Sequence, residues 1–181
     1  MNFDDAATKK QALERLVAVI PVVPFHGVDK FYDIGGLLAN PAELQLCLDL
    51  MAHEVAKMAD GIDAIGCFDA RGFLFAPYLG ARFQKKVFML RKPGKMPSVS
   101  HTIEYFKEYS GDNAATGGDH LSIQHYAVKA GDRVLLIDDL LATGGTAEAG
   151  VKLIAVLNGR KRVETAAPDS KLIALLNENN F

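Results

Sequence analysis

Three short apolar runs mark the sequence, and polar or glycine-containing segments bound each of them. They cover residues 64–68 (AIGCF), 87–90 (VFML) and 134–137 (VLLI). Apolar runs of this length, without alternating polar residues, are typical of strands that are buried on both faces of a sheet. The pattern therefore predicts three interior strands.

A segment that begins near residue 40 has the periodicity of a helix instead. Its apolar side chains recur at steps of three and four: Leu44, Cys47, Leu48, Met51, Val55 and Met58. Asn40 and Pro41 suit the cap and the first position of this helix, and Glu43 completes a capping box. The pattern ends at Asp60-Gly61. Residues 72–83 predict a short helix and turn, and residues 146–157 predict another helix.

Strands that alternate with helices predict an α/β fold, in which a parallel sheet carries helices on both faces. Ligands of such sheets bind at the carboxyl ends of the strands. Asp69, Arg91 and Asp138 each follow a predicted strand. We therefore expect these three segments to converge on one crevice.

Residues 93–119 break the pattern, because they are rich in Gly, Ser, Asp and Asn. A connection of this length is either a lid or binding loop, or plain surface disorder. The aromatic pair Tyr105-Phe106 beside Glu104 favours a long flexible lid.

The composition and net charge limit the kinds of partner that this protein is expected to bind. The chain has 181 residues, a mass of 19.6 kDa, 49% hydrophobic residues and a formal net charge of −2. This size suits a single domain over residues 1–181. A slightly negative charge gives no electrostatic reason to expect a nucleic acid or an anionic membrane as partner.

The sequence also predicts a cytoplasmic location. No apolar run approaches the roughly 20 residues that span a bilayer, and the first residues, MNFDDAATKKQALERL, lack the pattern of a signal peptide. The two cysteines, Cys47 and Cys67, lie on segments that read as buried. Such thiols are expected to be core residues in a reducing compartment rather than a disulfide.

The stretch VLLIDDLLATGGT, residues 134–146, carries the chemistry. A glycine-containing turn between a strand and a helix directs backbone N–H groups and a helix N-terminus at an anion. A P-loop would need a lysine where Val151 stands, so a nucleoside triphosphate is not expected. The cradle has room for one phosphate, and the preceding carboxylates, Asp138 and Asp139, can accept hydrogen bonds from a sugar diol. The predicted ligand is a sugar phosphate.

These residues resemble the phosphoribosyl-diphosphate motif of type I phosphoribosyltransferases, and DDLLATGGT is similar to the version in the adenine-using branch. Residues 68–75 (FDARGFLF) resemble that branch's DSRGFLFG, residues 91–97 (RKPGKMP) its RKxGKLP, and residues 102–105 (TIEY) its SLEYG. Residues 24–41 resemble PxPGIxFRDITPLLxxP, with one extra residue before Asp33. The resemblance runs from about residue 20 to about residue 157. It implies the family's parallel-sheet core, a small N-terminal hood over about residues 20–40 and a lid over about residues 93–119.

The resemblance implies transfer of ribose 5-phosphate from phosphoribosyl diphosphate to adenine, which gives AMP and diphosphate. Asp138 and Asp139 would hold the ribose hydroxyls, and the cradle of the 5′-phosphate would comprise Ala142, Thr143, Gly144, Gly145 and Thr146. The diphosphate would meet Arg71, Arg91, Lys92 and Lys95, together with the segment Asp69-Ala70, where the family often has a cis peptide. The resemblance also implies a homodimer in which Arg91 reaches the neighbouring site.

The resemblance also implies which residues bind the base. Phe31 would stack on adenine between its neighbours Lys30 and Tyr32, and Glu104 would manage the proton on the purine N7 side. Tyr105 would orient the substrate or close the site. Tyr32 stands where the family has a basic residue. We therefore expect the backbone of Tyr32, rather than its side chain, to contact the base. Beyond Leu157 the chain is expected to lack a helix-strand piece of the family.

Mg²⁺ is the expected cofactor, bound with phosphoribosyl diphosphate rather than by a protein cage. His26, His53, His101, His120 and His125 lack the spacing of metal ligands. Two alternatives remain at this stage: the same transfer to hypoxanthine, guanine or xanthine, and a non-catalytic regulator that senses phosphoribosyl diphosphate.

Overall fold

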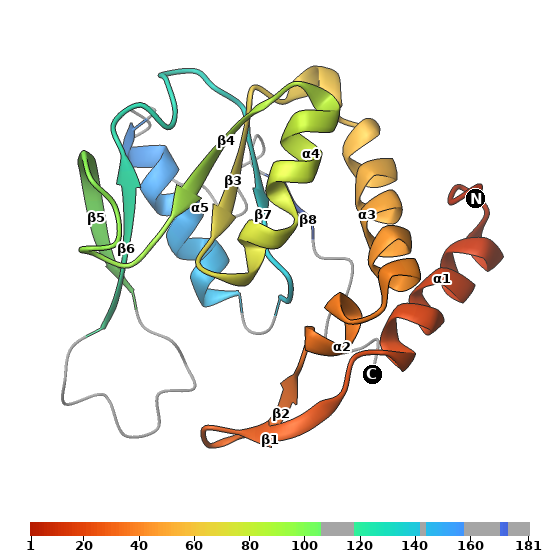
Figure 1. Cartoon of the computed structure of the whole chain (residues 1–181). Helices are drawn as coiled ribbons and strands as arrows, with labels where there is room; N and C mark the ends of the chain where they lie inside the picture. The colour runs from red at the N-terminus through yellow and green to blue at the C-terminus, as the bar shows by residue number, and fades with distance from the viewer. Residues whose placement is uncertain (106–117, 142–143, 158–170, 174–181) are drawn as a thin grey trace.

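A four-stranded parallel sheet forms the centre of the molecule (Figure 1). In this computed structural model the described residues are 1–105, 118–141, 144–157 and 171–173. The strands β3 (Ala64–Phe68), β4 (Lys86–Leu90), β7 (Val134–Ile137) and β8 (Lys171–Ile173) are arranged in the order β4-β3-β7-β8. All three predicted strands are present, and β3 and β7 are buried on both faces as expected. The prediction of burial on both faces was wrong for β4, which lies at the edge of the sheet with Lys86, Val87 and Met89 exposed. The fourth strand, β8, pairs in parallel with β7 and was not predicted. The helix-strand piece expected to be missing beyond Leu157 concerns residues that mostly lie outside the described part.

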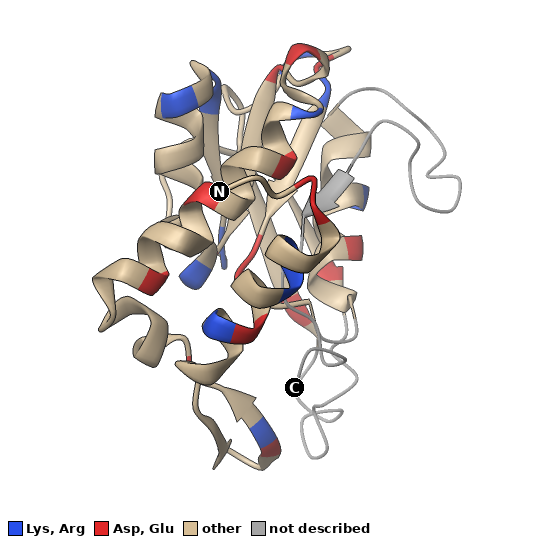
Figure 2. Ribbon diagram, turned by 90° about the vertical axis from the view of Figure 1, so that its right-hand side faces the viewer, with Lys and Arg blue, Asp and Glu red and all other residues tan. Residues whose placement is uncertain are grey.

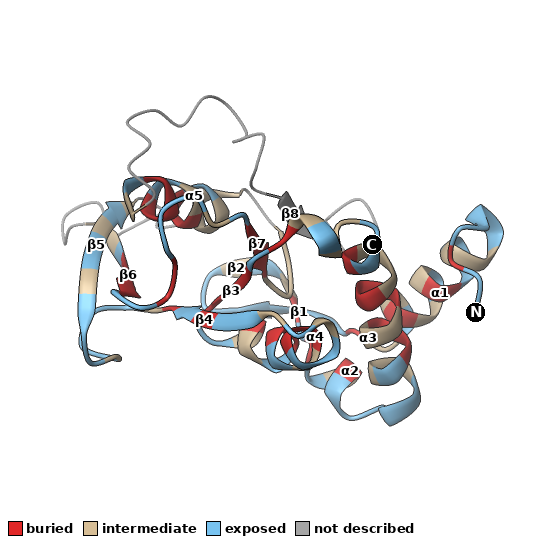
Figure 3. Ribbon diagram, turned by 90° about the horizontal axis from the view of Figure 1, so that it is seen from above, coloured by how far each residue is buried: buried red, intermediate tan, exposed pale blue. Residues whose placement is uncertain are grey.

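Helices cover both faces of the sheet, as the sequence predicts (Figure 3). Helices α3 (Pro41–Ala56) and α4 (Ala76–Phe83) share one core with alternate side chains of the strands, such as Ile65 and Ile137. Helix α5 (Gly145–Leu157) shares the other core with Phe68 and Leu136. Two short 3-10 helices, η1 (Ala59–Gly61) and η2 (Arg71–Leu74), follow α3 and β3.

The start of α3 differs from the predicted capping box. Asn40 occupies the N-cap position, but its side-chain amide donates to the carbonyl oxygen of Gly36 at 2.7 Å rather than accepting from the helix. Glu43 forms an ion pair with Arg15 at 2.6 Å instead of turning back to the cap. The competing partners are supplied by the preceding helix α2 (Gly35–Leu38) and by helix α1 (Ala6–Ala18).

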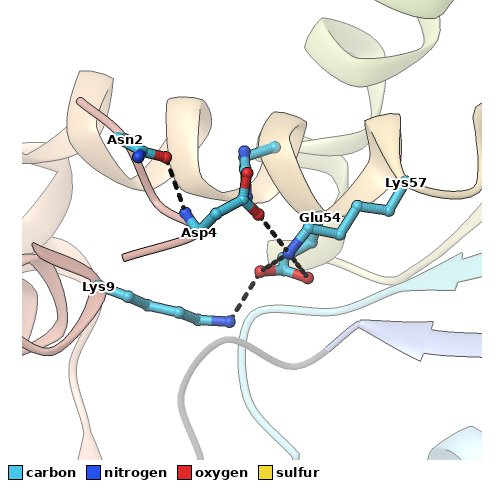
Figure 4. Close-up of polar contacts among 6 residues, drawn as sticks. Asn2, Asp4, Lys9, Glu54 and Lys57 are labelled. Atoms are coloured by element: carbon cyan, nitrogen blue, oxygen red, sulfur yellow. Dashed lines mark hydrogen bonds and ion pairs between the residues drawn. The ribbon is translucent and has the colours of Figure 1, made fainter. Parts of the chain in front are cut away.

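Helix α1 packs along α3 through its few buried residues, Ala12 and Leu16. Ion pairs reinforce the contact, with Lys9 Nζ 2.7 Å from Glu54 Oε1 and Lys57 Nζ 3.6 Å from Asp4 Oδ1 (Figure 4). The chain then forms the hairpin β1 (Val22–Phe25) and β2 (Val28–Tyr32), which extends from the body below α2 (Figure 1). This hairpin occupies the region expected to be the hood.

The segment predicted as a loop over residues 93–119 contains regular structure. Residues Val99–Tyr105 form strand β5, which pairs antiparallel with β6 (Asp119–Gln124). The prediction of a continuous loop was therefore wrong for residues 99–105, and residues 106–117 lie outside the described part. The pair adheres to the molecule because Ile103 and Tyr105 pack against the core of α5. Arg91 joins it to β4 through backbone hydrogen bonds with Ser122.

Both cysteines are free and buried, as expected from the sequence. Burial raises the pKa of each thiol to about 12. Within the described residues, no helix is both long and apolar enough to span a bilayer. Basic and acidic residues are interspersed on the face shown in Figure 2.

Candidate active site

The carboxyl ends of β3, β4 and β7 meet at one edge of the sheet. After β3, the Asp69 amide donates to the Leu90 carbonyl at 3.0 Å, and the Asp69–Ala70 peptide is cis, as the resemblance implied. After β4, Arg91 Nε lies 2.9 Å from Asp69 Oδ2. At the end of β7, a Cβ on Gly72 would lie 2.9 Å from the Ile137 carbonyl oxygen. Only glycine allows η2 to approach β7 so closely, and the predicted convergence of the three segments is confirmed.

Asp138 and Asp139 form a mostly buried acidic pair at the end of β7. The Asp139 amide donates to Asp138 Oδ1 at 3.0 Å. Burial, and then the neighbouring Asp139 charge, raise the pKa of Asp138 to about 7, whereas the Arg71 guanidinium acts in the opposite direction. The Asp139 side chain is 4% exposed, and its Oδ2 accepts no hydrogen bond although Arg71 Nε is 3.2 Å away. Despite the ion pair, Asp139 Oδ2 can therefore still accept a hydrogen bond from a hydroxyl group.

The turn between β7 and α5 suits an anion. Gly144 has a φ of +89°, and its carbonyl accepts the Glu148 amide at 2.8 Å. Helix α5 begins at Gly145, with Thr146 in its first turn. The N–H groups of a first helical turn have no partner within the helix, and the helix dipole favours negative charge there. Ala142 and Thr143, also predicted in this cradle, lie outside the described residues.

Arg71 connects the strand ends to the N-terminal hairpin. Besides its ion pair with Asp139, its NH1 donates to the Tyr32 carbonyl at 3.4 Å, and its guanidinium lies 5.2 Å from the centre of the Phe31 ring. Phe31 in turn lies 4.9 Å from the Phe25 ring. The Tyr32 side chain is buried in the core, so its carbonyl is the part that meets this edge. Lys30 is exposed on β2.

Two of the basic residues after β4, Arg91 and Lys92, have side-chain partners within the described residues. Arg91 NH1 donates to the Lys95 carbonyl at 3.2 Å, and the guanidinium lies 5.4 Å from the centre of the Phe73 ring. Lys92 Nζ lies 3.2 Å from Asp119 Oδ1 at the start of β6. The Lys95 side chain is exposed. Phe73, which the sequence marks only as apolar, thus supports a predicted site residue.

Glu104 and Tyr105 lie on opposite faces of β5, because side chains alternate along a strand. Tyr105 is partly buried against the α5 core, whereas Glu104 is exposed and its Oε1 accepts the Gly118 amide at 2.8 Å. In Figure 1, the Tyr105 end of β5 lies at the same end of the molecule as the N-terminal hairpin and the carboxyl ends of β3 and β7. The described residues contain no group of three metal-ligating side chains.

Comparisons with known proteins agree with this arrangement. The phosphoribosyl transferase domain family matches residues 33–175. An adenine phosphoribosyltransferase of Cenarchaeum symbiosum is 40% identical over 82% of this chain and 81% of its own length. The crystal structure of the Rhodothermus marinus adenine phosphoribosyltransferase aligns with a TM-score of 0.74 and 28% identity, over 92% of this chain and 98% of that one. The Saccharomyces cerevisiae enzyme, complexed with an imino-altritol bisphosphate and adenine, aligns with a TM-score of 0.74 and 27% identity, over 94% and 99%. The chain therefore belongs to the phosphoribosyltransferase family, within its adenine phosphoribosyltransferase branch.

Proposed function

We propose that this protein is an adenine phosphoribosyltransferase, which transfers ribose 5-phosphate from phosphoribosyl diphosphate to adenine and releases AMP and diphosphate. The observation that carries the proposal is the buried pair Asp138-Asp139 at the end of β7, followed at once by the Gly144 turn and the N-terminus of α5. Carboxylates beside a phosphate-sized turn suit a ribose 5-phosphate. The names of the relatives support adenine as the base.

The sugar end of the substrate would lie across the β7–α5 turn. The ribose hydroxyls would donate to Asp138 and Asp139, where Asp139 Oδ2 is ion-paired with Arg71 but accepts no hydrogen bond from the protein. The 5′-phosphate would accept hydrogen bonds from residues 142–146, where the first N–H groups of α5 are available.

The diphosphate end would meet the cations that follow β3 and β4. Diphosphate gains negative charge as its bond to ribose C1′ breaks, so fixed cations lower the barrier to its departure. Arg71, Arg91, Lys92 and Lys95 would supply these charges beside the Asp69-Ala70 backbone. Mg²⁺ would arrive with the substrate and neutralise part of its diphosphate charge, which agrees with the all-oxygen character of Asp138 and Asp139.

Adenine would lie against the N-terminal hairpin. Phe31 would stack on the ring, and the backbone of Lys30 and Tyr32 would read the base edge. In the reaction, purine N9 forms a bond to ribose C1′ as the diphosphate leaves, and the purine gives up its N7 proton. Glu104 would accept that proton, and Tyr105 would support the strand that carries Glu104.

We also propose that the protein acts as a homodimer in which Arg91 contributes to the neighbouring site. Apolar residues near Arg91 support this idea, because Val87 and Met89 alternate along β4 toward Arg91 and are 37% and 36% exposed. Large exposed apolar groups gathered beside a site often mark an interface. Native mass spectrometry of the wild type and of V87D/M89D would test it, with a monomeric wild type as the contrary result.

The free, buried thiols of Cys47 and Cys67 agree with a reducing compartment such as the cytoplasm. A fusion of the full chain to a fluorescent protein in its host, imaged against a cytoplasmic marker, would test this location.

A base panel tests the reaction itself. Purified protein is mixed with Mg²⁺, phosphoribosyl diphosphate and adenine, hypoxanthine, guanine or xanthine, and each nucleotide is quantified by chromatography. We expect AMP to form and the three 6-oxopurines to react far more slowly. Preference for a 6-oxopurine would favour the alternative transferase. Tight binding of phosphoribosyl diphosphate without any nucleotide product would favour a regulator.

A further inference from the structure

The guanidinium of Arg71 simultaneously contacts parts of the protein that belong to two different substrates. NH1 donates to the Tyr32 carbonyl, and the charge lies over one face of the Phe31 ring, in the hairpin proposed to receive adenine. Nε faces Asp139 Oδ2, in the pair proposed to hold the ribose. The Arg71 side chain therefore contacts both half-sites, namely the hairpin proposed to bind adenine and the acidic pair proposed to bind ribose.

Both contacts of Arg71 are long enough to be replaced readily by contacts with a bound anion. The Tyr32 bond is 3.4 Å long and the Asp139 contact is 3.2 Å without hydrogen-bond geometry, whereas good charge-assisted bonds measure about 2.7–2.9 Å. The Arg71 side chain is 39% exposed, so an anion can reach it. A diphosphate offers a guanidinium two parallel, shorter bonds, and it competes well for this side chain.

We propose that Arg71 is a latch between the two half-sites, and that the diphosphate of the sugar substrate opens it. Without that group, Arg71 occupies the Tyr32 carbonyl and one face of Phe31, and adenine must displace it. With diphosphate bound, Arg71 turns to the diphosphate and both groups become available to the base. This inference rests on the proposed function, and it adds a dependence of adenine binding on a group that adenine never touches.

The acidic pair explains why the complete substrate opens the latch best. Withdrawal of Arg71 leaves buried Asp139 without its cation, which is costly unless new hydrogen bonds replace it. The ribose hydroxyls of phosphoribosyl diphosphate supply them, so the complete substrate opens the latch at a lower concentration than diphosphate, which opens it only at saturation.

Equilibrium binding of adenine to the full chain tests the latch, because it requires no turnover. Calorimetry measures the Kd of adenine for the wild type alone, and again with saturating Mg²⁺ and inorganic diphosphate. The same titration without diphosphate is made with R71A and R71K. The control R82A removes a guanidinium that lies 5.9 Å from the Tyr78 ring and 3.8 Å from Asp49, a matched arrangement outside the site.

We expect diphosphate to tighten adenine binding to the wild type by about tenfold, within the usual range for coupled sites. R71A without diphosphate should already bind adenine with a similar gain, R71K should fall between, and R82A should equal the wild type. If adenine binding to R71A is unchanged or weaker, Arg71 is only a diphosphate ligand or a support of the hairpin, and the latch is refuted.

Two further results keep the latch separate from protein stability and from the proposed function. If R71A fails to fold, the wild-type titration alone decides, since a Kd that ignores diphosphate overturns the latch. A wild type that forms AMP while showing no such coupling refutes the latch and leaves the proposed function intact. A wild type that neither forms AMP nor binds adenine in any titration refutes both.

Discussion

Arg91 Nε and Asp69 Oδ2 lie 2.9 Å apart and join the residues that follow β4 and β3. Both side chains are partly buried, with exposed fractions of 27% and 20%. Because the guanidinium is planar, fixing its Nε edge also fixes the direction of its other donors, one of which holds the Lys95 carbonyl. The ion pair therefore positions the basic segment that we propose for diphosphate.

Disrupting this pair should weaken the use of phosphoribosyl diphosphate. We expect D69N and R91Q each to lower kcat/KM for that substrate by about tenfold or more, the loss typical of a misplaced positioning group. The double variant should be no worse than R91Q, because both changes act through the same guanidinium. D132N, which removes a partner of Lys86 at the opposite end of β4, is the matched control. Losses that simply add in the double variant would show that Asp69 does not act through Arg91.

Replacing Glu104 by glutamine should affect turnover rather than sugar binding. Glutamine keeps the size of the side chain and can still accept the Gly118 amide, but it cannot take up the purine proton. We expect kcat to fall by about a hundredfold or more, the usual contribution of a general acid or base, with KM for phosphoribosyl diphosphate nearly unchanged. Steady-state kinetics with E14Q, an exposed α1 residue, as control would measure this. Unchanged kcat in E104Q would remove Glu104 from the mechanism.

The core of this fold can be predicted from the sequence because its signals are local. The runs at β3, β4 and β7 have no polar interruption, which is typical of strands. The same pattern does not distinguish β3 and β7, which are buried on both faces, from the edge strand β4, which is exposed on one. Strand β5 is different, because its VSHTIEY sequence is mostly polar and exposed. It is stabilised by pairing with β6 and by contact with α5, neither of which leaves a pattern within the strand itself.

The candidate site divides in the same way. Asp69, Arg91 and Asp138 can be located from the sequence because charged residues stand directly after apolar strands. The partner of Arg71 could not be found in that manner, since the Tyr32 carbonyl is 39 residues away and every residue carries an equivalent group. Similarly, Asn40 is a good cap by type, but the Gly36 carbonyl competes for its side chain only in the folded chain.

Gly144→Ala should impair phosphate binding through the backbone alone. A Cβ there would meet nothing closer than Leu141 Cδ1 at 3.9 Å, so the cost arises from the φ of +89° and not from a clash. We expect the unfolding free energy to fall by about 1 kcal/mol and KM for phosphoribosyl diphosphate to rise severalfold. Gly131 has a φ of +88° with nothing within 4 Å, so G131A should lose similar stability without a change in KM. Equal KM values for the two variants would argue against a cradle at Gly144.

The acidic pair should make the protein less stable as pH rises. Burial and the Asp139 charge raise the pKa of Asp138 from 3.8 to about 7, so the folded chain binds a proton that the unfolded chain has lost between these values. Stability contributed by the protonated form is therefore present below about pH 4 and is lost as pH rises through about 7. D138N stays neutral throughout. It should exceed the wild type by up to about 4 kcal/mol in unfolding free energy at pH 8.5 and match it near pH 4.

Urea titrations of the wild type and D138N over this pH range measure the difference, and Asp63 provides a control of opposite sign. Hydrogen bonds from Arg133 hold the pKa of Asp63 below its usual value, so its ionised form stabilises the folded chain above the unfolded pKa. D63N should therefore be less stable than the wild type at pH 8.5, and the difference should vanish as pH falls through the range in which Asp63 is protonated.

D138N should also lose activity at every pH, because the ribose would lose a carboxylate partner. A D138N variant with unchanged stability at pH 8.5 would mean that Asp138 is not strained by its burial beside Asp139.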